Sequence, residues 1–180
     1  MEDNIFLNGE PLGIPEVLAN KDKRAHLQIQ LEKKYPEATI VSIKLNIPGP
    51  IKNNQMINHL FDVGYRRLLR TQLYNIKIID KMGWNTNTGK EEFLVMNKNG
   101  SALKKLAIQF EDHDRLGRLF DVDVMDAHHS HYSRTDLDMA PRKCLICHHN
   151  AKECARNRTH SVEDLQKKIS EIYFKDAKNE

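Results

Sequence analysis

At residues 117–124 the chain reads Gly-Arg-Leu-Phe-Asp-Val-Asp-Val. Side chains of a β-strand alternate between its two faces, so Asp121 and Asp123 share one face while the apolar residues beside them share the other. The apolar face can enter a core, and the rigid strand then holds two carboxylates close together. Hard cations such as Mg²⁺ bind one or two carboxylates together with substrate phosphates. The segment therefore predicts a strand with a magnesium site for phosphate chemistry; the alternative is an exposed edge strand with two solubilising aspartates.

The residues around this strand supply other parts expected of such a site. Displacement at phosphorus usually uses two cations that clamp the attacking and leaving oxygens, so a third carboxylate is expected, with Glu111 and Asp136 as candidates. Arg118 presents a planar fork to phosphate oxygens and stays charged, and Gly117 suits a close approach to phosphate. The alternative for each carboxylate is a surface acid, and for Arg118 a surface ion pair.

A second candidate segment, residues 48–52, reads Pro-Gly-Pro-Ile-Lys and joins a predicted strand to a predicted helix. The free N–H groups and the dipole of a helix N-terminus attract anions. Gly49 and Lys52 are therefore candidate phosphate contacts. The alternative is a stiff turn that binds no ligand.

A third constellation places three thiols and an imidazole within seventeen residues: Cys144, Cys147, Cys154 and His160. This is a Cys₃His ligand set for a tetrahedral structural Zn²⁺. His148 and His149 are rival ligands, since the spacings after Cys147 are not those of a standard zinc finger. The alternative is a group of reduced cysteines that pack as small hydrophobic residues.

Length and composition limit the class of protein. With 180 residues, 39% of them hydrophobic and 29% charged, the chain is expected to fold as one soluble domain, residues 1–180, with a Cys/His-rich subsite at 141–160. No run approaches the ~20 apolar residues of a membrane span, and no secretory signal is found, so we expect a cytoplasmic protein without a membrane partner. An odd number of cysteines fits a reducing compartment. A net charge of +3 gives no argument for nucleic acid.

Hydrophobic periodicity and turn signals predict an α+β fold with a small, mostly antiparallel sheet and packed helices. The predicted helices cover residues 14–20, 22–35, 53–76, 101–110 and 162–174, with a strand as the alternative for 106–110. Two predicted strands cover residues 38–47 and 92–96. A third follows a turn at 117–118 and ends near residue 125, and a turn at 126–129 leads from it into a return strand at 132–134. Residues 84–89 are predicted as a turn-rich connection, and 141–160 as irregular.

Three of these segments together, residues 48–52, 117–124 and 141–160, resemble the apo-citrate lyase phosphoribosyl-dephospho-CoA transferase (holo-citrate lyase synthase) family, with the match running from about residue 14 to 165. The resemblance implies a nucleotidyltransferase-like enzyme. Its reaction moves the 2'-(5''-phosphoribosyl)-3'-dephospho-CoA group from the triphosphate precursor, 2'-(5''-triphosphoribosyl)-3'-dephospho-CoA, to a serine of the citrate lyase acyl carrier protein (γ subunit). Pyrophosphate is released.

The resemblance also assigns roles to residues. Asp121 and Asp123 would hold Mg²⁺ on the triphosphate, and Arg142 of the 141–160 segment is expected to bind substrate. Arg24 and Gln28 also match family positions and are expected to bind substrate, with a surface role as the alternative. The base that accepts the serine proton is unassigned, with Glu111 as the natural candidate. Two alternatives remain open: the same transfer to a malonate decarboxylase carrier protein, and a zinc-stabilised binding module without enzymatic activity.

Overall fold

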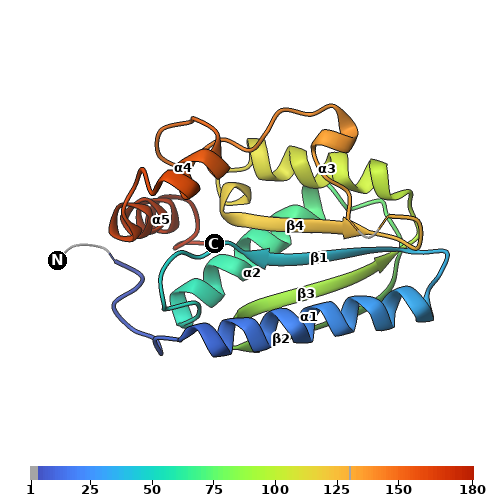
Figure 1. Ribbon diagram of the computed structural model, residues 1–180, viewed down its shortest axis with the longest axis horizontal. Coiled ribbons are helices and arrows are strands. Elements are labelled where there is room, and N and C mark those ends of the chain that lie inside the picture. Colours follow the sequence, from blue (N-terminus) through green and yellow to red (C-terminus); the bar gives the residue numbers. More distant parts are fainter. Residues whose placement is uncertain (1–3, 130) are drawn as a thin grey trace.

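The computed structural model describes residues 4–129 and 131–180, which form a four-stranded antiparallel sheet of order β2-β3-β1-β4 with helices on both faces (Figure 1). The predicted α+β class is confirmed, whereas the nucleotidyltransferase-like fold and the single domain stay predictions. The strands are β1 (Thr39–Leu45), β2 (Ile78–Thr86), β3 (Gly89–Met96) and β4 (Phe120–Met125). The helices are α1 (Ile14–Lys34), α2 (Gln55–Thr71), α3 (Gly100–His113), α4 (Ala151–Asn157) and α5 (Val162–Asp176), with short 3₁₀ turns at Gly117–Leu119 and Thr135–Leu137.

The two faces of the sheet bury two separate apolar clusters because strand side chains alternate. On one face, β1 and β4 pack against α2, α3 and α5, and Phe120 lies between Phe61 and Phe110 at ring-centroid distances of 5.6 and 5.4 Å. Gly64 of α2 makes room for this packing, since a Cβ there would lie 2.2 Å from the Phe120 ring. On the other face α1 covers a smaller cluster around Phe93. Asp121 and Asp123 belong to this second face, beyond the part that α1 covers (Figure 1).

Helix α3 closes the free edge of β4. Lys104 donates through Nζ to the Val122 carbonyl at 2.7 Å, and Glu111 accepts the Val122 N–H at 2.9 Å. Both side chains are buried. An edge strand with unpaired backbone groups invites pairing with other chains, so this cover both satisfies the groups and fixes the strand that carries the aspartates.

The N-terminal half differs from the prediction in two places. Residues 14–34 form one continuous helix without a break near Asn20, because the Asn20 side chain donates to Glu91 of β3 at 2.6 Å and so is accommodated inside the helix. Residues 78–86 form the edge strand β2, so the turn-rich connection predicted at 84–89 is reduced to the turn at residues 87–88. Trp84 packs on Phe93 with a centroid distance of 5.2 Å, and this cross-strand contact overrides the polar local sequence.

The C-terminal half also required corrections. Residues 106–110 are helical, so the strand alternative is wrong, and Asn99 caps α3. The predicted return strand at 132–134 is wrong: Tyr132 donates its N–H to the Val124 carbonyl, but a 3₁₀ turn follows at once. Residue 130 of that predicted hairpin lies outside the described residues. The segment predicted to be irregular contains α4, which Asn150 caps.

The length and hydropathy of each helix show whether it could span a membrane. Within residues 4–129 and 131–180, no helix has the length and apolar content needed to cross a bilayer.

Candidate functional site

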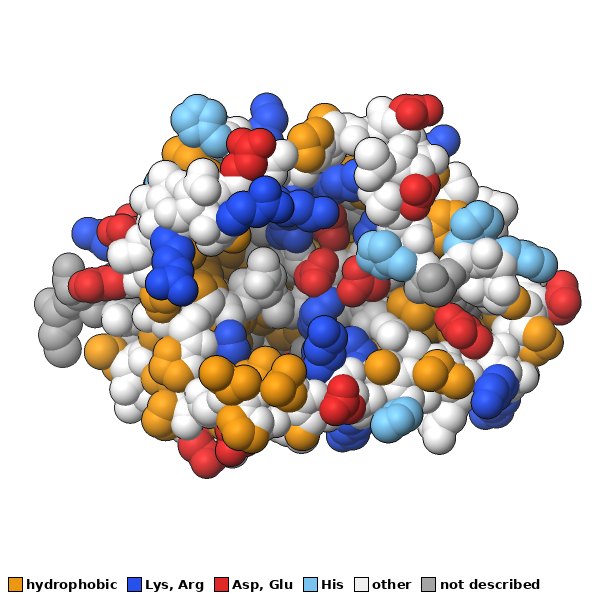
Figure 2. Space-filling model, viewed as in Figure 1, with side chains coloured by type: hydrophobic (Ala, Val, Ile, Leu, Met, Phe, Trp, Pro, Cys, Tyr) orange, Lys and Arg blue, Asp and Glu red, His pale blue; other side chains and the backbone are white. Residues whose placement is uncertain are grey.

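The strand predicted to carry paired carboxylates is β4, and Asp121 and Asp123 lie on the same face of it. Lys44 of the neighbouring strand β1 lies between them, with Nζ at 2.6 Å from Oδ2 of Asp121 and 2.9 Å from Oδ2 of Asp123. The antiparallel register, which pairs Lys44 with Asp121, sets this arrangement. Figure 2 shows acidic side chains at the centre of a hollow, with basic side chains on both sides of it.

The three charges stabilise one another. Burial opposes ionisation of Lys44, but the two aspartates raise the pKa of its ammonium group. Burial likewise opposes ionisation of Asp121, but Lys44 lowers the pKa of this carboxyl below its usual value. The Asp121 side chain keeps 41% of its surface exposed, whereas Lys44 keeps 17%. Asp121 is therefore held in its charged form and remains accessible to solvent.

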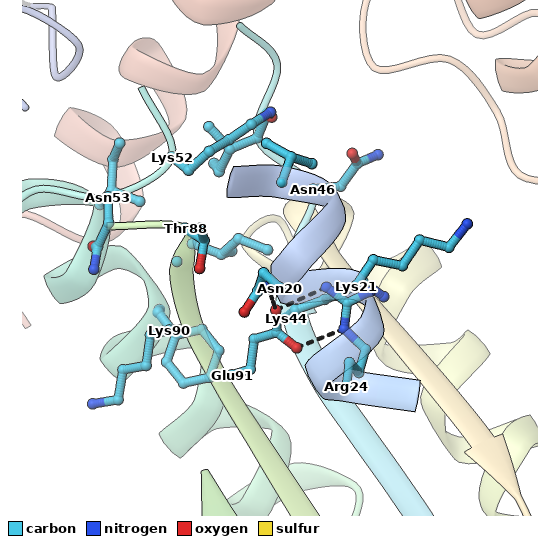
Figure 3. Close-up of a pocket in the computed structure, with 16 residues that line it drawn as sticks. Asn20, Lys21, Arg24, Lys44, Asn46, Lys52, Asn53, Thr88, Lys90 and Glu91 are labelled. Carbon is cyan, nitrogen blue, oxygen red and sulfur yellow. Dashed lines mark hydrogen bonds and ion pairs between the residues drawn. The ribbon is translucent and has the colours of Figure 1, made fainter. Parts of the chain in front are cut away.

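A pocket of about 240 Å³ opens beside Lys44, between α1, β3 and the loop after β1 (Figure 3). Arg24 from α1 donates to both oxygens of Glu91 at 2.6 and 2.8 Å, and Asn20 donates to the same carboxylate. Glu91 is almost fully buried, at 2% exposure. The hydrogen bond to Glu91, although opposed by burial, raises the pKa of Arg24. Arg24 thus has a structural partner as well as a place in the pocket wall.

The loop predicted to bind phosphate lines the same pocket through Lys52. The Lys52 ammonium donates to the Ile47 carbonyl at 2.6 Å, and burial lowers its pKa. The first turn of α2 is partly satisfied already, because Asn54 accepts the Ile57 N–H. Gly49 adopts φ +84° and lies against α5, where a Cβ would meet Gln166 at 2.6 Å. Packing against α5 thus accounts for the glycine, whereas Lys52 faces the pocket (Figure 3).

A second pocket, of about 610 Å³, combines an apolar wall from α5 with four basic residues: Arg118, Arg142, Lys143 and Arg158. Arg118 donates to the Lys143 carbonyl at 2.7 Å, and Arg142 donates to the Arg118 carbonyl. Burial and the neighbouring Arg142 lower the pKa of Arg118, although a guanidinium stays charged at neutral pH. Asn46 lines both pockets, so they adjoin at the end of β1.

Three residues predicted for the site make hydrogen bonds or packing contacts elsewhere in the structure. Glu111 uses one oxygen for the Val122 N–H and the other for Arg134 at 2.9 Å, on the side of α3. Asp136 accepts the Ser133 N–H within an exposed turn. Gly117 is buried, and a Cβ there would lie 2.0 Å from the Phe110 carbonyl oxygen. The structure therefore brings none of the three to the carboxylates, and it gives Glu111 and Gly117 structural reasons to be present.

The four predicted zinc ligands do converge. One ligand atom each from Cys144, Cys147, Cys154 and His160 lies within 4.8 Å of the others, and His148 and His149 are not in the group. The His160 Nε2 is buried without a hydrogen-bond partner among the described residues. A hydrogen bond with Cys147, together with burial, raises the pKa of Cys154 to about 11. Tetrahedral Zn²⁺, with Zn–S bonds of about 2.3 Å, holds its sulfurs roughly 3.8 Å apart, so this group is compatible with a metal ion.

Two residues at the carboxylates had not been predicted. Lys44 has no distinguishing local motif, and only the β1–β4 register reveals it. His131 lies with Nδ1 at 3.7 Å from Oδ1 of Asp123 and is half exposed. It belongs to the histidine-rich turn after β4, whose proximity to the Asp-x-Asp strand was the available signal.

Comparison with known proteins gives consistent matches. The family model described as apo-citrate lyase phosphoribosyl-dephospho-CoA transferase matches residues 12–176. The chain is 36% identical over 176 residues to "Probable apo-citrate lyase phosphoribosyl-dephospho-CoA transferase" of Streptococcus pyogenes serotype M5 (strain Manfredo), covering 96% of this chain and 91% of the relative. It is 30% identical over 175 residues to the Escherichia coli O1:K1 protein named apo-citrate lyase phosphoribosyl-dephospho-CoA transferase, covering 93% and 91%. "Protein CitXG" of Haemophilus influenzae (strain Rd) is 35% identical over 91% of this chain but only 35% of the relative.

Proposed function

The chain belongs to the apo-citrate lyase phosphoribosyl-dephospho-CoA transferase family, and we propose that it performs the transfer which this name describes. It attaches the 2'-(5''-phosphoribosyl)-3'-dephospho-CoA group to a serine of the citrate lyase acyl carrier protein, in the cytoplasm. The reaction is a nucleotidyl transfer. The names of the relatives give no support to a malonate decarboxylase carrier or to a non-enzymatic zinc module.

The observation that carries this proposal is the Asp121–Asp123 pair on one face of β4, which shares Lys44 at the edge of the smaller pocket. Lys44 binds only the Oδ2 atoms, and Oδ1 of Asp121 has no hydrogen-bond partner among the described residues. Two hard carboxylate oxygens on an open surface fit Mg²⁺, which keeps several waters and binds substrate phosphates. When bound, Mg²⁺ neutralises charge on the transferring phosphoryl group.

In this proposal the two adjoining pockets bind different parts of the substrate. The larger pocket offers an apolar wall and arginines to the dephospho-CoA part, whose rings are apolar and whose phosphates are anionic. The smaller pocket offers Lys52 and Arg24 to phosphate oxygens. The α-phosphorus then lies at the carboxylates, where the serine hydroxyl of the carrier attacks it and pyrophosphate leaves. Catalysis of this kind depends mainly on positioning and charge neutralisation.

The proton of the attacking serine needs an acceptor near the carboxylates. Both oxygens of Glu111 are engaged with Val122 and Arg134, which argues against the role expected from the sequence. His131 is half exposed at the open side of Asp123 and has the chemistry of a general base. It takes the serine proton in this proposal, so replacing it by Gln is expected to lower kcat far more than it changes KM.

The Cys₃His group holds a structural Zn²⁺ in this proposal. It joins the segment that carries Arg142 and Lys143 to the start of α5, and both parts line the larger pocket. The ion therefore keeps this pocket in shape. Purified protein is expected to contain close to one equivalent of zinc.

The experiment that tests the function measures pyrophosphate release from the triphosphate precursor with Mg²⁺. Release is expected only when the apo carrier is present, and it should be nearly abolished in the Asp121→Asn variant. Exposed Asp138 offers a matched control, because Asp138→Asn makes the same isosteric change at a residue that lines neither pocket. Release that proceeds equally without the carrier, or equally in the Asp121→Asn variant, contradicts the proposal.

A further inference from the structure

Lys44 occupies the position that a cation between the two carboxylates would take. Its ammonium contacts one oxygen of each aspartate, and the side chain is largely withdrawn from solvent. The arrangement is fixed by the sheet, since Lys44 and Asp121 are paired across β1 and β4 and Asp123 lies two residues further along the same face. If the Lys44 ammonium moved out of this position with nothing in its place, the carboxylates of Asp121 and Asp123 would face each other without a counter-ion.

A divalent cation placed between the two carboxylates would bind oxygens of the same two groups that Lys44 contacts. A cation bound to them would lie within a few ångströms of the Lys44 ammonium, where like charges repel strongly in a partly buried site. Lys44 must then move, and burial makes an unpaired ammonium unfavourable. The space next to it is the smaller pocket, which Lys44 lines together with Arg24 and Lys52. Glu91, a carboxylate of this pocket, is already bonded to Arg24 and Asn20, so an anion entering the pocket would supply the partner of the displaced ammonium.

We propose that Lys44 is a built-in counter-ion, which holds Asp121 and Asp123 until substrate arrives and then moves its ammonium group onto a substrate phosphate. This inference rests on the proposed function, in which the two aspartates bind the cation. It follows that the free protein binds a divalent cation weakly. The triphosphate supplies both the cation's remaining ligands and the new partner of Lys44, so the two bind cooperatively.

The test measures Mn²⁺ binding to the free protein, by the loss of the paramagnetic resonance signal of the free ion. Mn²⁺ prefers the same oxygen ligands as Mg²⁺. The Lys44→Gln variant is expected to bind Mn²⁺ at least about tenfold more tightly than the parent protein, because one positive charge has left the site. It should at the same time transfer the prosthetic group much more slowly. Lys44→Arg, which keeps the charge, should bind Mn²⁺ as weakly as the parent.

Lys81→Gln is the matched control, since Lys81 is also a strand lysine beside a carboxylate, Glu92 at 3.5 Å, but lies on β2 away from the hollow. It should change neither binding nor transfer. Because Lys44→Gln leaves two carboxylates facing each other, the variant should melt at a lower temperature than the parent and recover with Mn²⁺. The double variant Lys44→Gln/Asp121→Asn should lose the tightened binding.

Unchanged Mn²⁺ affinity in Lys44→Gln, or transfer at the parent rate, overturns the role of Lys44. A failure of the proposed function itself would give a different result in the transfer assay. In that case Asp121→Asn itself transfers the group at the parent rate, whatever the behaviour of the lysine variants.

Discussion

Replacing Arg24 by Met tests whether this residue is first of all the partner of a buried carboxylate. Glu91 has a side-chain exposure of 3% and receives two hydrogen bonds from Arg24, at 2.6 and 2.8 Å. Among residues 4–129 and 131–180, the carboxylate of the variant keeps only Asn20 as a side-chain hydrogen-bond partner. Removing one member of a buried pair typically costs 3–5 kcal/mol, and since Arg24 is itself 20% exposed we expect the lower end, about 3 kcal/mol.

The loss of unfolding free energy is measured by urea unfolding of four proteins: the parent, Arg24→Met, Glu91→Gln and the double variant. A loss of about 3 kcal/mol corresponds to a fall in Tm of roughly 6–12 °C for a protein of this size. The double variant should regain about 2 kcal/mol of that loss, because no charge is stranded. Lys34→Met is the control, since Lys34 also joins α1 to a sheet carboxylate, Asp80, but is 61% exposed, and it should cost less than about 1 kcal/mol. A cost below about 1 kcal/mol for Arg24→Met, with no recovery in the double variant, would refute the reasoning.

Three further predictions follow from the same geometry. Cys144→Ser should lose the bound zinc and lower Tm, whereas His149→Ala should keep the zinc; metal analysis of both proteins decides, and equal zinc in both would argue against the Cys₃His site. Gly117→Ala should destabilise the fold by about 1–3 kcal/mol in urea, because its Cβ would meet the Phe110 carbonyl; a fully stable variant would show that α3 can move. Lys44 lowers the pKa of Asp121, so the pair contributes stability above the ordinary aspartate pKa of about 3.9, and this contribution is lost as pH falls through the lower pKa of the folded state. The difference in unfolding free energy between the parent and Asp121→Asn should therefore shrink below about pH 4, and a difference that stays constant to pH 2 would contradict this.

The parts of the fold and site that were predictable from sequence are those set by short-range spacing. The two-residue period of a strand placed Asp121 and Asp123 on one face, and β4 has that arrangement. The Cys/His spacing named the four residues that converge, although only the folding of α4 brings Cys154 to the others. In both cases the functional residues are close to one another in the sequence, so local spacing is enough to identify them.

The parts that were missed depend on contacts between distant segments. Lys44 is 77 residues from Asp121 in sequence, and only the β1–β4 register brings them together. Glu111 was a candidate for catalysis because it shortly precedes the aspartates in sequence, but its carboxylate accepts the Val122 N–H of the edge strand β4, a contact that no local pattern reveals. Asn20 suggested a helix break until its partner Glu91, on β3, was known.

The central claim is that the Asp121–Asp123 pair carries the transfer, and mass spectrometry of the carrier tests it most directly. Apo citrate lyase acyl carrier protein is incubated with the triphosphate precursor, Mg²⁺ and either the parent, Asp123→Asn or Asp138→Asn. The account predicts that the parent and Asp138→Asn add the mass of one phosphoribosyl-dephospho-CoA group to the carrier. Asp123→Asn, although folded, should do so at least about a thousandfold more slowly, a loss of ~4 kcal/mol of transition-state stabilisation. Loading of the carrier by Asp123→Asn at the parent rate would contradict the account.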